Sequence, residues 1–150
     1  MPVVLLTVLL ASGPAGAEWQ VMPAGRAGAS GCSLTSAPQP VWDGYQNTTA
    51  HLVVDRSSFV VRSPSVLDGT GSEIGVQVDT KPFVPMDRLS AARTASFDAS
   101  HSGLVEQFKA GRQVRVQLKF WPTWPATGTH SATFSLLGFT KAYAEMEACR

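Results

Sequence analysis

Residues 114–120 read Val-Arg-Val-Gln-Leu-Lys-Phe, an alternation of apolar and polar side chains. This period of two predicts a β-strand with one buried face. Residues 133–137, Thr-Phe-Ser-Leu-Leu, predict a second strand that ends at Gly138. Apolar residues then recur at helical spacing over residues 139–146, which predicts a C-terminal helix with one buried face. We expect the rest of the chain to pack on this strand–loop–strand–helix unit.

The upstream sequence contains several short strand-like runs separated by turn-forming residues. Residues 104–110 predict a short helix, residues 89–93 a helical turn, and residues 94–98 a strand. Pro38 and Pro40 are expected to stop an early strand. Together these elements predict a mainly β fold, a β-sandwich or curled antiparallel sheet with one or two short helices, including the C-terminal helix. The predicted upstream strands are residues 19–21, 32–35, 51–55, 59–62 and 74–79.

The N-terminal residues have the form of a secretory signal peptide. Residues 3–11 are almost wholly apolar, and Ala15-Gly16-Ala17 provides a small-residue cleavage site. A membrane-spanning helix needs about 20 apolar residues, roughly twice this run. A buried N-terminal strand is the alternative interpretation. We expect residues 1–17 to be removed on bacterial export, leaving residues 18–150 as a single periplasmic or secreted domain with no stable membrane span.

The net charge limits the possible partners, and the two cysteines of the expected exported chain predict a disulfide. The formal net charge is +1, so the chain lacks the basic field that nucleic acid attracts, and no nucleic-acid partner is expected. Cys32 and Cys149 are the only two cysteines, which predicts a disulfide in an oxidising compartment. In the chain-entropy model, closing so long a loop contributes roughly 4–5 kcal/mol.

The residue types that commonly take part in catalysis or bind metals are scattered along the sequence. His51, His101 and His130 occur singly, without the spacing of a zinc site, and none is near a cysteine in sequence. Ser100 and Ser102 flank His101, but sequence neighbours seldom face one another and no nucleophile elbow is present. A phosphate loop and a dinucleotide fingerprint are also absent. We therefore predict no enzyme activity, no catalytic residues, no metal and no cofactor.

The loop after the main strand carries the features of a binding surface. Residues 121–125 read Trp-Pro-Thr-Trp-Pro, a proline-stiffened segment with two large rings, which are typical anchors at interfaces. In the alternative interpretation, one or both rings fold back and cap the open end of the sandwich, because exposed aromatic pairs are costly. Trp42 and Tyr45, an aromatic pair in another loop, would complete either arrangement. The candidate partner-binding residues are Trp121, Pro122, Trp124, Pro125, Trp42 and Tyr45.

The order of elements from residue 74 onward resembles the invasion-associated locus B family of exported bacterial proteins. The matching segments include the helix at residues 104–111 and the run at residues 134–142, which resembles the family's Ser-Leu-x-Gly-Phe-x-x-Ala signature. Trp19 and Cys32 match the family's opening tryptophan and first cysteine. The family's central cysteine pair is missing near residues 86–97, and Cys149 is present instead. The resemblance implies an exported β-sandwich linked to host interaction or envelope function, with no catalytic residues.

These observations favour a non-enzymatic exported binding protein that contacts an envelope or host macromolecule, either protein or glycan. Two alternatives remain open at this point. One is a periplasmic inhibitor or immunity-type protein that blocks a secreted enzyme. The other is a carbohydrate-binding module that uses the loop containing Trp121 and Trp124.

Overall fold

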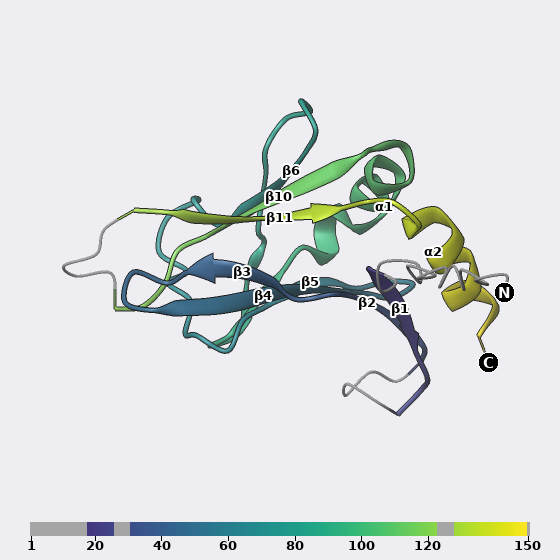
Figure 1. Cartoon of the computed structure of the whole chain (residues 1–150), viewed down its shortest axis with the longest axis horizontal. Coiled ribbons are helices and arrows are strands. Elements are labelled where there is room, and N and C mark those ends of the chain that lie inside the picture. The colour runs from purple at the N-terminus through teal and green to yellow at the C-terminus, as the bar shows by residue number, and fades with distance from the viewer. Residues whose placement is uncertain (1–17, 26–30, 123–127, 150) are drawn as a thin grey trace, which may run out of the picture.

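The computed structural model describes residues 18–25, 31–122 and 128–149, and it is mainly β, as predicted. Two antiparallel sheets face each other and two short helices lie at one end of the molecule (Figure 1). The larger sheet has the order β1-β2-β4-β5-β9-β8, with β3 also paired to β4, and the smaller has the order β11-β10-β6-β7. The strands of the larger sheet are β1 (Trp19–Met22), β2 (Ser33–Ser36), β3 (Gln39–Trp42), β4 (Asn47–Val54), β5 (Phe59–Arg62), β8 (Arg88–Ala91) and β9 (Thr94–Ser96).

The smaller sheet is built around the alternating stretch at residues 114–120. Its strands are β6 (Gly75–Val78), β7 (Val84–Pro85), β10 (Gln113–Leu118) and β11 (His130–Ser135). Val114 pairs with Val78 on one side of β10 and with Phe134 on the other, and all three side chains are buried. Arg115 lies on the outer face and is exposed. The predicted strand and its buried face are therefore confirmed.

Both predicted helices are present, and they contribute to the core. Helix α1 (His101–Ala110) follows the short 3-10 helix η1 (Asp98–Ser100), and α2 (Phe139–Ala148) follows β11. Phe108 from α1 packs edge-to-face on Phe139 from α2 and on Phe59 from β5, with ring centroids 5.2 and 5.1 Å apart. Trp19 from β1 packs on Phe139 at 5.0 Å. This aromatic cluster joins the larger sheet to both helices.

Strands β2 and β3 run one after the other along the same edge of β4. Thr35 of β2 pairs with Val53, and Gln39 of β3 pairs with Ala50. The ladder is interrupted between them, where the Ser36 hydroxyl accepts a hydrogen bond of 2.9 Å from the buried N–H of Leu52. A side-chain oxygen thus substitutes for the backbone carbonyl that regular pairing would supply.

We expect Ser36→Ala to lower the free energy of unfolding by about 1–3 kcal/mol, because it leaves the Leu52 N–H buried without an acceptor. Ser33→Ala is a matched control, since the Ser33 hydroxyl is buried on the same strand and has no hydrogen-bond partner among the described residues. That control should be neutral or slightly stabilising. Urea unfolding of both variants checks the difference, and equal losses would contradict this role of Ser36.

One part of the predicted secondary structure is wrong, and one strand was not predicted. Residues 89–93 were expected to form a helical turn, but they lie in strand β8 and the turn after it, because pairing with β9 outweighs the helical preference of Leu-Ser-Ala-Ala-Arg. Pro38-Gln39-Pro40 was expected to stop the early strand, and β2 does end at Ser36, but the sequence did not predict the further strand β3, which begins at Gln39 and contains Pro40. It is tolerated because β3 pairs on one side only, with β4, so no second neighbour needs the missing N–H.

Candidate binding site

The described candidate binding residues, Trp42, Tyr45, Trp121 and Pro122, belong to segments at the end of the sandwich opposite the helices. The turn between β3 and β4 lies at this end, and so does the chain that leaves β10 (Figure 1). Residues 63–67 link the two segments. The N–H of Trp121 donates to the carbonyl of Val66 at 2.9 Å, and the next residue back, Ser65, donates its hydroxyl to Asp43 Oδ2 at 2.9 Å.

The aromatic side chains at this end are open to solvent. Trp42 is 47% exposed, Tyr45 49% and Trp121 61%, and Pro122 is exposed beside Trp121. The alternative in which Trp121 folds back as a core cap therefore does not hold. Trp124 and Pro125 lie outside the described residues. We call Trp42, Tyr45 and Trp121 the aromatic end.

Asp43 fixes the turn that carries two of these rings. Its Oδ1 atom accepts the backbone N–H groups of Tyr45 and Gln46, each at 2.8 Å, and Oδ2 accepts the Ser65 hydroxyl. Burial raises the pKa of Asp43, but the hydrogen bonds from Gln46, Tyr45 and Ser65, with a contribution from His130, outweigh it and leave the pKa below its ordinary value. Asp43 is not among the residues predicted from the sequence, although Asp-Gly between two apolar runs is a recognised hairpin signal.

The lowered pKa of Asp43 makes part of the stability depend on pH. The folded state favours the carboxylate, so this contribution is complete above the unfolded pKa of about 4 and is lost as the pH falls through the lower folded pKa. Thermal unfolding measured from about pH 5 downward should show a steeper fall in Tm for the natural protein than for Asp43→Asn. Parallel curves would contradict the assignment.

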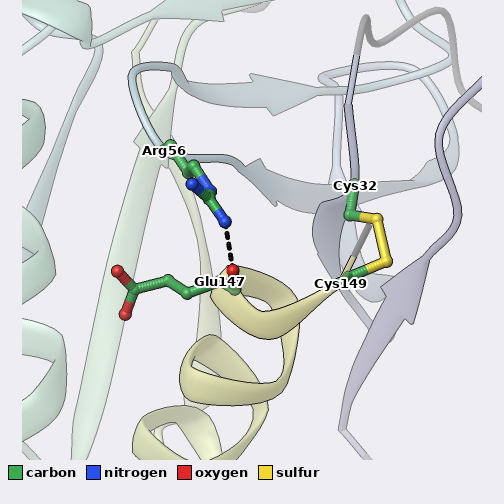
Figure 2. Close-up of a disulfide and its surroundings, with 4 residues drawn as sticks. All are labelled: Cys32, Arg56, Glu147 and Cys149. Atoms are coloured by element: carbon green, nitrogen blue, oxygen red, sulfur yellow. Dashed lines mark hydrogen bonds between the residues drawn. A yellow bond between two sulfur atoms is a disulfide. The ribbon is translucent and has the colours of Figure 1, made fainter.

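The disulfide lies among the helices, at the other end of the molecule. Cys32 is bonded to Cys149 across a sequence separation of 117 residues, with the Cα atoms 6.1 Å apart. Arg56, in the turn between β4 and β5, donates to the backbone carbonyl of Glu147 in the last turn of α2 (Figure 2). A guanidinium at this position compensates the negative end of the helix dipole. A hollow of about 440 Å³ is lined by both cysteines, Arg56 and Met146.

The three histidines do not form a common site. His51 lies in β4, His101 begins α1, and His130 begins β11. Burial, together with the nearby charge of Arg62, lowers the pKa of His51. A ring nitrogen of His101 is 2.7 Å from the carbonyl oxygen of Asp55. Within residues 18–25, 31–122 and 128–149, no three side chains of His, Cys, Asp or Glu are grouped as a metal site would require.

The fold and the site together define a mainly β antiparallel domain with a terminal disulfide at one end and exposed aromatic rings at the other. Helices of the length and apolar character needed to cross a membrane do not occur in the described part of the chain. Comparisons with family models, with curated proteins and with solved structures found no match to this sequence.

Proposed function

We propose that this protein is a non-enzymatic, exported binding protein that contacts an envelope or host macromolecule through its aromatic end. The observation that carries the proposal is the meeting of Trp42, Tyr45 and Trp121 at one end of the sandwich, each about half exposed or more. Soluble proteins rarely leave several large rings together in water, and such groups commonly mark binding surfaces. Tryptophan and tyrosine also dominate the binding energy of many interfaces.

The surroundings of the aromatic end suit binding rather than catalysis. Asp43 is a buried carboxylate at this end, and both of its oxygens already accept hydrogen bonds that hold the turn. With these bonds in place, Asp43 acts as a positioning group for Trp42 and Tyr45. The rings are therefore presented on a fixed hairpin, and little side-chain and loop entropy is lost when a partner binds.

Export is supported by two separate features. Residues 1–17 have the form of a signal peptide, and the Cys32–Cys149 disulfide is compatible with an oxidising compartment. The resemblance to the invasion-associated locus B family points in the same direction and adds host interaction or envelope function as the context. In that setting the natural partner is a component of the bacterial envelope or of a host surface.

The proposal is tested by capture of partners from envelope and host-surface extracts, using the immobilised oxidised protein. We expect the double variant Trp42→Ala/Trp121→Ala to bind the captured partner more weakly, with a dissociation constant raised by a factor of at least about 30. Such a factor corresponds to the loss of about 2 kcal/mol of binding free energy at a hot spot. Its Tm should stay within a few degrees of the natural value, because both rings are exposed.

Phe83→Ala is the matched control, since Phe83 is an exposed ring just before β7, the edge strand of the smaller sheet, and its loss should leave binding intact. Unchanged binding by the tryptophan double variant would contradict the assigned surface. A large fall in its Tm would show instead that the indoles belong to the core.

A carbohydrate-binding module is the second candidate, because the rim of the aromatic end also offers uncharged hydrogen-bonding groups. Gln46 and Asn47 are exposed beside Tyr45. Flat rings stack on the apolar faces of sugars, and side-chain amides donate and accept hydrogen bonds with their hydroxyl groups. A glycan array probed with the natural protein and the tryptophan double variant separates this candidate from a protein partner.

A further inference from the structure

The outward face of the larger sheet carries two arginines and no carboxylate on its strands. The seven strands contain no aspartate, glutamate or lysine, and Arg62 and Arg88 are their only arginines. Both point away from the core, because Val61 beside Arg62 is buried and Leu89 beside Arg88 packs against the core. The ion pairs among the described residues involve lysines only, so neither arginine is neutralised by a carboxylate.

Four aspartates flank these strands, and each is held by the backbone. Their carboxylates accept N–H groups of turns and strand ends, and the four are Asp43, Asp55, Asp87 and Asp98. These negative charges are therefore fixed at the ends of the strands, and the face between the ends keeps its positive charge.

Strand pairing puts Trp42 of the aromatic end on the same face as Arg62. Opposite residues of antiparallel strands share a face, and so do residues an even number apart in one strand. Trp42 is opposite Asn47 of β4, and His51, further along β4, is opposite Arg62. The segment from Asn47 to His51 spans about 13 Å at the usual rise of a strand. The outward face can therefore hold an extended chain rather than a single small molecule.

Uncharged hydrogen-bonding groups line this face around the tryptophan and the arginines. Asn47 is exposed, and Thr49, His51 and Thr94 are partly exposed. Burial and the charge of Arg62 lower the pKa of His51, so its ring is neutral near neutral pH and offers one N–H donor and one acceptor. Amide, hydroxyl and imidazole groups of this kind pair well with sugar hydroxyl groups.

The valines of this face offer little apolar area to a partner. Val53 and Val60 lie opposite each other in its middle and are only 8% and 9% exposed. Protein interfaces usually have an apolar centre from which charged residues are depleted. Here the exposed Trp42 ring lies at one end of a polar and basic surface. Both helices lie at the end of the molecule and do not cover the outward face of this sheet (Figure 1).

We infer that the outward face of the larger sheet binds a carboxylate-bearing polysaccharide. The inference rests on the proposed function and names the chemical class of its partner. Trp42 stacks on a sugar ring, and the polar groups of β4 bond the sugar hydroxyl groups. Arg62 and Arg88 each bind a carboxylate, for which the forked donors of a guanidinium are suited. Negative charge on the polysaccharide complements the two arginines, which form no ion pair in the described chain.

The test is calorimetric titration of the full oxidised protein with an oligogalacturonate and with the methyl ester of the same oligosaccharide. The ester keeps the rings and the hydroxyl groups but has no charge. We expect the acid to bind, with an affinity that falls as salt is raised, and the ester to show a dissociation constant at least about tenfold higher. No binding of the acid, or equal binding of acid and ester, overturns the inference.

Arg62→Gln and Arg88→Gln locate the site, and each should raise the dissociation constant for the oligogalacturonate at least about tenfold. Arg62→Lys is a second variant that keeps the charge and the aliphatic stem but loses the fork, so it should bind with intermediate affinity and fold normally. Arg115→Gln is the matched control, because Arg115 is an exposed arginine on the outward face of the smaller sheet. An equal effect of Arg115→Gln would show general charge attraction and overturn the assigned face.

Two further ligands separate the polysaccharide from other anions. Tighter binding of polyglutamate would indicate an acidic protein partner, and tighter binding of dextran sulfate would indicate a sulfated one; either result overturns the inference. Failure of the inference is distinct from failure of the proposed function. If no oligogalacturonate binds but Trp42→Ala/Trp121→Ala still loses the captured partner, the aromatic end stands and only the ligand class is wrong.

Discussion

Replacing both cysteines, Cys32→Ser with Cys149→Ser, is expected to lower the free energy of unfolding by about 5 kcal/mol, the chain-entropy value for a loop of this length. The bond joins the chain just before β2 to the end of α2, so its loss frees nearly the whole domain in the unfolded state. Urea unfolding of the natural oxidised protein and of the double variant measures the difference.

The control for that prediction is the natural protein after reduction, which should unfold at the same urea concentration as the double variant. Both have lost the same covalent link, and serine keeps nearly the size of the reduced cysteine. If reduction leaves the midpoint unchanged, the bond contributes nothing to stability and the role assigned to it is wrong.

Phe108→Ala is expected to lower the free energy of unfolding by about 3–5 kcal/mol, as truncation of a fully buried aromatic ring usually does. Phe108 contacts the rings of Trp19, Phe59 and Phe139, so one truncation opens a cavity where α1, α2 and the larger sheet meet. Thermal or urea unfolding of the variant measures the loss.

Phe108→Leu is the matched control for the ring contacts. It keeps the site apolar and most of its volume filled, so it should lose less than half of what the alanine variant loses. If the two variants lose equal free energy of unfolding, Phe108 does not stabilise the fold by filling volume in the core.

The sequence predicts the elements whose buried face appears as a regular spacing of apolar residues within a short segment. The alternation at residues 114–120 predicts β10, and the spacing of Phe139, Ala142, Tyr143 and Met146 predicts the buried face of α2. In both cases burial on one face is enough to select the structure. The cysteine count likewise predicts the Cys32–Cys149 bond, since only one intramolecular pairing of the two cysteines exists.

The errors arise where pairing with the next strand along the chain outweighs the local preference of the residues. Residues 89–93 have a helical composition, but β9 offers them backbone partners, and the strand wins. The prolines do end the early strand, but strand β3, which contains Pro40, was missed, because among the described residues β3 pairs only with β4 and so tolerates the missing N–H. Both partner strands follow directly along the chain, but the composition of these segments does not show that they pair.

The candidate site was predictable in its residues but not in its arrangement. The sequence singles out Trp42, Tyr45 and Trp121 as aromatic residues in loops. Their meeting at one end depends on the contact of residues 63–67 with Asp43 and Trp121, which sheet topology creates. The hydrogen bond from Ser65 to Asp43 joins residues 22 apart, and no periodic pattern announces it.

The account rests on a division between a stabilising end and a binding end. The disulfide, Arg56 and the aromatic core cluster lie near the helices, while the exposed rings that we propose bind a partner belong to segments at the far end. Substitutions at the aromatic end should therefore change binding with little effect on folding, and substitutions at the disulfide should do the reverse.

The most direct measurement is mass spectrometry of the protein taken from its natural cells, alkylated before lysis and digested without reduction. The account predicts a peptide pair linked through Cys32 and Cys149, with no alkylated thiol and with the N-terminal apolar segment absent. Two alkylated cysteines on a chain that still carries residues 1–17 would contradict both the covalent closure of the fold and the proposed export.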